Sequence, residues 1–201
     1  GYTESLSDSK LPATQETFDI MYDEAQHLSR MIDDLRTLSL ADAGELPLNR
    51  RPVDPRSLLE RDSTAHTPEA ERRGLSIQIE VPPDLPEVEV DPGRMAQVLE
   101  NLMSNALRYT PEGGEITLSA AAEGNTVFLR VKDNGAGIAP EDLPYIFDRF
   151  YRGEKSRQRQ EGESGLGLGI TKSIVEAHGG GVSVESILGE GTTFSIGVPT
   201  A

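Results

Sequence analysis

The stretch that most constrains the fold is the helix expected at residues 91–109, which opens with Asp91-Pro92. Proline fits the first position of a helix, because the amide hydrogen that it lacks would have no helical partner there. On a helix that turns about 100° per residue, four apolar side chains form one stripe: Met95, Val98, Leu102 and Ala106. Four other side chains form the neighbouring stripe: Asn101, Asn105, Arg108 and Tyr109. The fold must therefore bury one side of this helix and leave two amides, a cation and a phenol beside the core.

Composition narrows the class of partner. The 201 residues carry a formal net charge of −15 and contain no cysteine. Nucleic acids and anionic membrane surfaces attract clustered Lys and Arg, so neither is expected as a partner. Disulfides, thiolate metal sites and cysteine nucleophiles are excluded. Because no apolar run approaches the ~20 residues that span a bilayer, we expect no direct membrane contact by these residues.

Residues 15–43 read as a separate long helix. Its apolar side chains recur at steps of three and four, as in a coiled coil or helical bundle: Phe18, Met21, Ala25, Leu28, Ile32 and Leu35. This seam predicts dimerisation, with packing against the chain's own domain as the alternative. Tyr2–Lys10 would be the end of an antiparallel partner helix.

The pattern changes after this helix. Ala43-Gly44 ends it, and the proline-punctuated stretch up to Pro55 predicts a hinge. Beyond the hinge, helices are expected at 55–72, 91–109, 140–148 and 167–178, and strands at 75–81, 88–90, 115–123, 126–133, 181–186 and 192–198. A hairpin is expected around Gly124-Asn125. Strands and helices that do not alternate strictly predict an α+β fold.

Two glycine-rich segments suggest a nucleotide site. EGESGLGLG (161–169) completes neither a P-loop nor a dinucleotide fingerprint. Its last glycines run straight into a helix, where free amide N–H groups can bind an anion, although a flexible loop is the alternative. DNGAGI (133–138) follows an apolar strand, so Asp133 lies at a strand end. Its carboxylate could accept a hydrogen bond from the amine of adenine, with a simple Asp-Asn-Gly turn as the alternative.

Five segments in register resemble the ATP-binding domain of bacterial sensor histidine kinases, a family related to gyrase, Hsp90 and MutL. They are NLMSNALRYT, DNGAGI, IFDRFYR, GLGLG and GEGTTFSIGVP, which look like that family's N, G1, F, G2 and G3 boxes. The resemblance covers about residues 45–201 and implies a Bergerat-type α/β sandwich, in which a mixed sheet carries helices on one face. Residues 1–44 would be part of the family's dimerisation and phosphoacceptor helical domain.

The resemblance also implies roles for single residues. Asn105 would bind Mg²⁺ through its amide oxygen, and Asn101 would contact the same metal–phosphate cluster. Arg108 would reach the phosphates, and Tyr109 would pack on adenine. Arg149 or Arg152 would contact the γ-phosphate, and the sequence leaves the choice between them open. The remaining predicted nucleotide contacts are Asp133, Gly135, Gly137 and Ile138 around the base, Gly165, Leu166, Gly167, Leu168 and Gly169 over the phosphates, and Thr192 beside adenine.

Hydrolysis of ATP is expected to be poor. By this resemblance, Asn101 stands at the position where gyrase and Hsp90 carry a glutamate that activates water. An asparagine side chain cannot act as a base. Glu100 is one residue away, and that offset turns it about 100° from the pocket face. The site should therefore position ATP for an incoming nucleophile, which suits neutral imidazole.

None of the three histidines fits the family's acceptor motif. His27 lies in the second bundle helix, His66 in a polar stretch and His178 at a helix end, so surface or helix-end roles are expected for all three. The chain begins with Gly1 and is interpreted as a fragment. We therefore expect these residues to bind Mg²⁺-ATP without phosphorylating themselves.

The predicted function is the ATP-binding catalytic region of a two-component sensor histidine kinase. The intact protein would transfer the γ-phosphoryl to a histidine and then to an aspartate on a response-regulator receiver domain. Homodimerisation through 15–43, a cytoplasmic location and a parent anchored in the bacterial inner membrane are expected. The alternatives are an anti-sigma serine kinase, an ATP-dependent clamp of the Hsp90 or MutL sort, and a degenerate pseudokinase.

Overall fold

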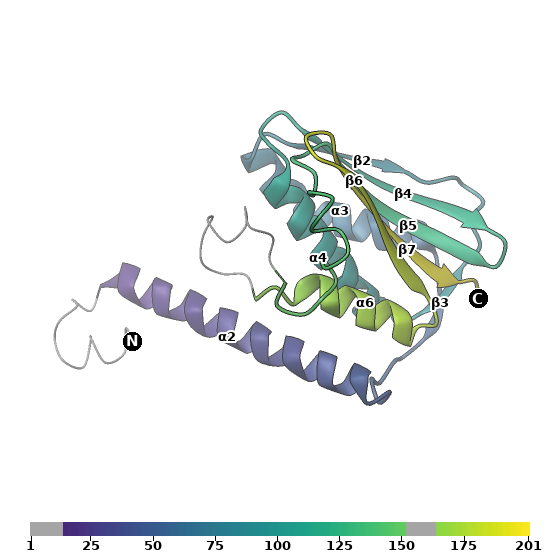
Figure 1. The fold of residues 1–201 in the computed structure, drawn as a ribbon, viewed down its shortest axis with the longest axis horizontal. Coiled ribbons are helices and arrows are strands. Elements are labelled where there is room, and N and C mark those ends of the chain that lie inside the picture. Colours follow the sequence, from purple (N-terminus) through teal and green to yellow (C-terminus); the bar gives the residue numbers. More distant parts are fainter. Residues whose placement is uncertain (1–13, 152–163) are drawn as a thin grey trace.

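A long helix precedes a layer of sheet and helices (Figure 1). The computed structural model describes residues 14–151 and 164–201, apart from the side chains of Glu16, Asp23 and His27. Helix α2 (Gln15–Asp42) begins after Thr14, whose side chain accepts a hydrogen bond from the amide of Thr17, and ends before Gly44 at a φ of +69°. The helix predicted at 15–43 is confirmed, and the partner helix expected at Tyr2–Lys10 lies outside the described residues.

Five strands form a mixed sheet in the order β2-β4-β5-β7-β6. Their bounds are Ser76–Glu80 for β2, Glu115–Glu123 for β4, Thr126–Asp133 for β5, Gly181–Ile187 for β6 and Gly191–Pro199 for β7. Strands β2 and β4 run parallel, and the other neighbours run antiparallel. The predicted hairpin between β4 and β5 is confirmed, with Glu123 opposite Thr126.

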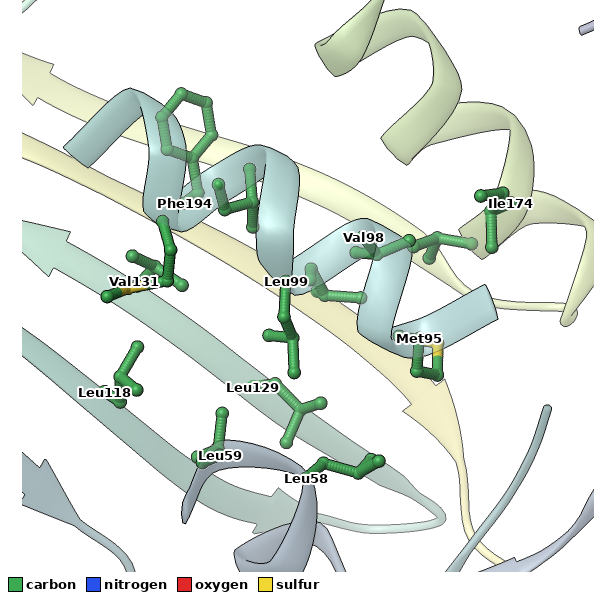
Figure 2. Packing of buried hydrophobic residues seen from close by; sticks show 14 of the residues in the cluster. Leu58, Leu59, Met95, Val98, Leu99, Leu118, Leu129, Val131, Ile174 and Phe194 are labelled. Carbon is green, nitrogen blue, oxygen red and sulfur yellow. The ribbon is translucent and has the colours of Figure 1, made fainter. Parts of the chain in front are cut away.

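Helices α3 (Pro55–Arg72), α4 (Pro92–Tyr109) and α6 (Gly167–Ala177) cover one face of this sheet (Figure 1). The apolar stripe predicted on α4 is buried: Met95, Val98, Leu102 and Ala106 are at most 3% exposed. Figure 2 shows Met95, Val98 and Leu99 of α4 between the sheet, α3 and Ile174 of α6. Truncating a buried leucine to alanine typically costs about 2–5 kcal/mol, so this helix anchors the core. The predicted α+β sandwich is confirmed.

One local prediction was wrong, and one short strand was not predicted. Residues 140–150 form successive turns, not the helix expected at 140–148, with hydrogen bonds such as Asp148 N to Tyr145 O at 2.8 Å. Pro144 has no amide hydrogen for an α-helical bond, which explains the difference. The stretch up to Pro55, which was predicted as a hinge, contains a strand that was not predicted, β1 (Arg51–Val53), and it pairs with β3 (Val88–Val90). The sequence did not indicate this strand because Pro52 lies in its middle, and proline within a sheet is largely confined to edge strands such as this one.

No helix in the described part of the chain is long and apolar enough to cross a bilayer.

Candidate nucleotide-binding site

The polar face of α4 forms one wall of the site. Asp91 caps the helix by accepting hydrogen bonds from the amides of Gly93 and Arg94, at 2.8 and 3.1 Å, so the start of α4 is fixed. Asn101 and Asn105 are half-buried, as expected for side chains beside the core stripe. The Arg108 guanidinium carbon lies 5.7 Å from the centre of the Tyr109 ring, which is 40% exposed.

One end of this face touches the glycine-rich helix start. Asn101 donates from Nδ2 to the carbonyl oxygen of Gly167, 3.0 Å away, where α6 begins. Gly165 has a φ of +67°, and an added Cβ would lie 3.0 Å from the backbone of Phe150, so glycine is required. The first turn of α6 has no side-chain cap, because Leu166 occupies that position. Its amide N–H groups are therefore available to an anion.

The other end of α4 touches the loop that follows β5. The amide of Ala136 donates to the carbonyl oxygen of Tyr109 at 3.1 Å. Gly135 approaches the same carbonyl so closely that a Cβ would lie 2.4 Å from it. This glycine is thus required for loop packing. The eight steps from Asn101 to Tyr109 rise about 12 Å along the helix, which sets the length of the wall.

Asp133 is buried at this second end. Its side chain is 6% exposed, its Oδ1 accepts from the amide of Gly135 at 2.9 Å, and the amide of Thr192 also donates to it. Burial raises the pKa of Asp133 above the usual value, against the effect of these two hydrogen bonds. A carboxylate held in this way keeps lone pairs for a further donor.

The β6–β7 hairpin closes the site near Asp133. Ser186 Oγ lies 2.9 Å from Thr192 Oγ1 and accepts from the amide of Ile138 at 2.8 Å. An added Cβ on Gly137 would lie 2.1 Å from the carbonyl oxygen of Ile187, so this turn also requires glycine. The sequence analysis missed Ser186. The available signal was the alternating pattern of GVSVES (181–186), which is typical of a strand. In the structure this strand pairs Ser186 with Thr192.

Of the two arginines expected at the γ-phosphate, the structure describes Arg149, whose Cγ lies 3.6 Å from where a Cβ on Gly169 would stand, while its guanidinium is directed to α2. Arg149 forms an ion pair with Asp42 at the end of α2, and the hydrogen bond from Arg149 lowers the pKa of Asp42. Arg152 lies outside the described residues.

Two further predicted phosphate contacts lie in the first turn of α6. Leu168 is half-buried, and Gly169 is buried. A Cβ added to Gly169 would lie 3.4 Å from the carbonyl oxygen of Phe147.

Glu100 points away from the site, as predicted. Its Oε2 lies 3.1 Å from Nε2 of His66, on the side of α4 that faces α3. The expected surface role of His66 was wrong, because this side chain is only 10% exposed. His178 does end α6 as expected, but it is 1% exposed and its Nε2 accepts from the amide of Asp91 at 3.0 Å. Both histidines are held in the interior by contacts that sequence periodicity does not show.

The donor set suits a nucleotide with a metal ion. An acceptor for an amine lies at the C-terminal end of α4, uncapped amides lie beside its middle, next to Asn101, and the Asn105 side chain lies on the helix between them. Mg²⁺ prefers oxygen ligands of this kind and shares them with phosphate oxygens. The arrangement therefore fits an elongated ligand with an amine-bearing ring and a polyanionic tail.

Comparisons with known proteins agree with this chemistry. Residues 90–201 match the family described as histidine kinase-, DNA gyrase B- and HSP90-like ATPase. The chain is 38% identical over 202 residues to the sensor protein SrrB of Staphylococcus aureus, which covers 99% of this chain and 34% of SrrB. The chain thus spans about a third of the length of the curated relatives that it matches.

Solved structures extend the likeness to the helix before the sheet. The histidine kinase AdeS of Acinetobacter baumannii has a TM-score of 0.83 at 26% identity, covering 100% of this chain and 92% of that one. Full-length ShkA in complex with AMPPNP has a TM-score of 0.81 at 30% identity, covering 96% of this chain and 40% of that one. The chain therefore belongs to the histidine kinase-, DNA gyrase B- and HSP90-like ATPase family and forms the ATP-binding catalytic region of a sensor histidine kinase.

Proposed function

We propose that this chain binds ATP with Mg²⁺ along the polar face of α4 and presents the γ-phosphoryl group to a histidine. The observation that carries the proposal is that α4 connects the buried carboxylate of Asp133 to the uncapped start of α6. The backbone carbonyl of Tyr109 accepts from Ala136 in the loop after Asp133, and the side-chain amide of Asn101 donates to the carbonyl of Gly167. Residues 45–201 would be the catalytic domain, and residues 1–44 would belong to the dimerising helical domain.

Asp133 is the proposed adenine reader. Two backbone amides orient its carboxylate, so a remaining lone pair can accept from the exocyclic amine of adenine. Gly135, Gly137 and Ile138 would border the base together with Thr192. Tyr109, which is 40% exposed, would pack on the ring.

Asn105 is the proposed metal ligand, and Asn101 would contact the same cluster. When bound, Mg²⁺ would neutralise charge on the phosphate oxygens. The segment from Gly165 to Gly169 would cover the phosphates with amide N–H groups of the first turn of α6, while the amide of Leu166 donates to Ser164 Oγ at 3.3 Å. The Arg108 guanidinium would add donors. Little covalent chemistry is required of the protein, since phosphoryl transfer depends mainly on positioning and charge stabilisation.

Transfer to a protein histidine is favoured over hydrolysis by the direction of Glu100. This acid is paired with His66 on the far side of α4, and Asn101 occupies the position beside the site. His66 and His178 are buried, so neither is proposed as the acceptor. We propose that the acceptor histidine belongs to the longer protein, which passes the phosphoryl group to a response-regulator aspartate.

Homodimerisation through α2 completes the proposal. Phe18, Leu28 and Ile32 of the predicted seam are 51%, 51% and 66% exposed, which supports packing by further helices. Ile32→Glu should weaken self-association in sedimentation experiments. Gln26→Glu adds the same charge about 120° around the helix and should leave it intact. Equal association of both variants would count against this dimer.

The kinase proposal is tested in the longer protein that contains the acceptor histidine. Incubation with radiolabelled Mg²⁺-ATP should give an acid-labile, base-stable label, and Asn105→Ala or Asp133→Asn should remove it. Asn125→Ala and Asp84→Asn change the same residue types in turns away from the site and should retain it. Label that persists in both site variants, with folding unchanged, would refute the proposal.

A further inference from the structure

A polar cluster interrupts the buried face of α3. This face packs apolar residues such as Leu58, Leu59 and Ala70, yet Asp62 and His66 lie among them and are each only 8% exposed. Glu100 of α4 joins them from the facing helix. Apolar side chains of similar volume would generally stabilise such a contact as well or better. Packing alone therefore does not account for these three residues.

The hydrogen bonds of His66 show where a positive charge belongs. Its Nδ1 lies 2.8 Å from the carbonyl oxygen of Asp62, and only an N–H can make that contact. Its Nε2 lies 3.1 Å from Glu100 Oε2. A neutral ring with its hydrogen on Nδ1 would direct the Nε2 lone pair at a carboxylate. Either a proton or a metal ion must therefore lie between the two atoms.

Asp62 distinguishes these two occupants. Its Oδ1 lies 3.5 Å from His66 Nδ1, while its Oδ2 is buried without a hydrogen-bond partner. Among the described residues, only Thr171 has another such side-chain atom. A proton on Nε2 satisfies His66 and Glu100 but leaves Asp62 Oδ2 buried and unpaired, which is unfavourable for a polar atom. A metal ion could use a ligand atom from all three residues.

We propose that Asp62, His66 and Glu100 form a binding site for one divalent transition-metal ion of the Zn²⁺ type, joining α3 to α4. One ligand atom from each residue lies within 4.8 Å of the other two, and no other described group of three His or acidic side chains meets this condition. Imidazole with carboxylates suits Zn²⁺ and its neighbours, whereas Mg²⁺ prefers oxygen ligands alone.

Features around the cluster support this choice. The bond from Nδ1 to a backbone carbonyl is the usual outer-shell contact that fixes the tautomer of a metal-binding histidine. Two carboxylates balance the charge of a divalent ion. The Glu100 side chain is 64% exposed, so it provides an entry path and room for a water as a fourth ligand. The site is separate from the proposed Mg²⁺ position at Asn105 and does not depend on it.

The test uses the metal-free chain without nucleotide at pH 7.5, in enough salt to suppress loose binding to this acidic protein. Calorimetric titration with ZnCl₂ should give one site per chain, and Co²⁺ should give a d–d absorption spectrum typical of nitrogen and oxygen ligands. His66→Gln and Asp62→Asn should weaken Zn²⁺ binding at least about 10-fold, as even outer-shell changes do. Glu71→Gln removes an exposed carboxylate from the same helix and should leave binding unchanged.

Two additions keep the test decisive. Glu100→Gln alters the exposed member of the cluster, so it should fold even where the buried variants do not, and it should also weaken Zn²⁺ binding. Zn²⁺ should shift the NMR signals of the His66 ring, and equimolar Mg²⁺ should not. Failure of the wild-type chain to bind one Zn²⁺, or equal binding by Glu100→Gln and Glu71→Gln, would show that the cluster holds a proton only and would overturn the proposal.

Discussion

The side-chain amide nitrogen of Asn101, Nδ2, lies 3.0 Å from the carbonyl oxygen of Gly167 and donates a hydrogen bond to it. This contact joins the middle of α4 to the first residue of α6, 66 positions later in the chain. It fixes the spacing between the polar face of α4 and the uncapped amides of α6.

Asn101→Ala should weaken ATP binding, because it removes the hydrogen bond that holds the start of α6 beside α4. This effect does not require Asn101 to contact ATP itself. A net hydrogen bond contributes about 0.5–1.5 kcal/mol, so its loss should reduce affinity about 2- to 10-fold. Titration with a fluorescent ATP analogue would measure the change. Asn125→Ala, in the exposed β4–β5 turn, serves as the control. An unchanged affinity in Asn101→Ala would show that the α6 start is held in other ways.

The pair between Arg149 and Asp42 predicts a difference between ATP and ADP. If Arg149 leaves Asp42 to contact the γ-phosphate, Arg149→Ala should lower affinity for ATP more than for ADP, while Asp42→Asn should raise the ATP-to-ADP preference. The pair is exposed, so the melting temperature should hardly change. Asp33→Asn on the same helix is the control. An unaltered ATP-to-ADP ratio in Arg149→Ala would leave the γ-phosphate contact to another residue.

Acid should weaken nucleotide binding through Asp133. The carboxylate accepts from adenine only when ionised, and burial raises its pKa, so the loss should begin at higher pH than for an ordinary aspartate. The measurement compares ATP affinity between pH 7.5 and 5 in wild type and Asp133→Asn. Titration of ATP itself affects both proteins equally and cancels. Parallel pH profiles would contradict the assignment of Asp133.

His178 should make stability depend on pH. Burial lowers its pKa below the usual 6.5, so the unfolded chain binds the proton more tightly than the folded chain does. The stabilising contribution is thus present above pH 6.5 and is lost as the pH falls through the folded-state value. Urea unfolding at pH 7.5, 6.5 and 5.5 should give a shallower pH dependence for His178→Gln, which can still accept from the amide of Asp91. Identical slopes would mean that His178 does not contribute.

Local patterns were sufficient to predict much of this fold. The buried stripe and amide pair of α4, the turn at Gly124-Asn125 and the glycines before α6 each reflect interactions within a few residues. Asp133 was also placed correctly at a strand end, because an apolar strand precedes it directly.

Features that depend on distant partners could not be predicted in the same way. The short strand β1 exists only because it pairs with β3, and Arg149 meets Asp42 across 107 positions. His66 looked like a surface residue because its own neighbours are polar, while its burial comes from packing of α3 against α4. These contacts arise from the tertiary arrangement, about which periodicity carries no information.

The most direct measurement of the central claim is ATP binding by this chain with and without Mg²⁺. Calorimetry should show binding that requires Mg²⁺ for full affinity, and Asn105→Ala should remove the gain due to Mg²⁺ while Asn125→Ala retains it. ATP binding that is equally tight without Mg²⁺, or an undiminished Mg²⁺ effect in Asn105→Ala, would contradict the account.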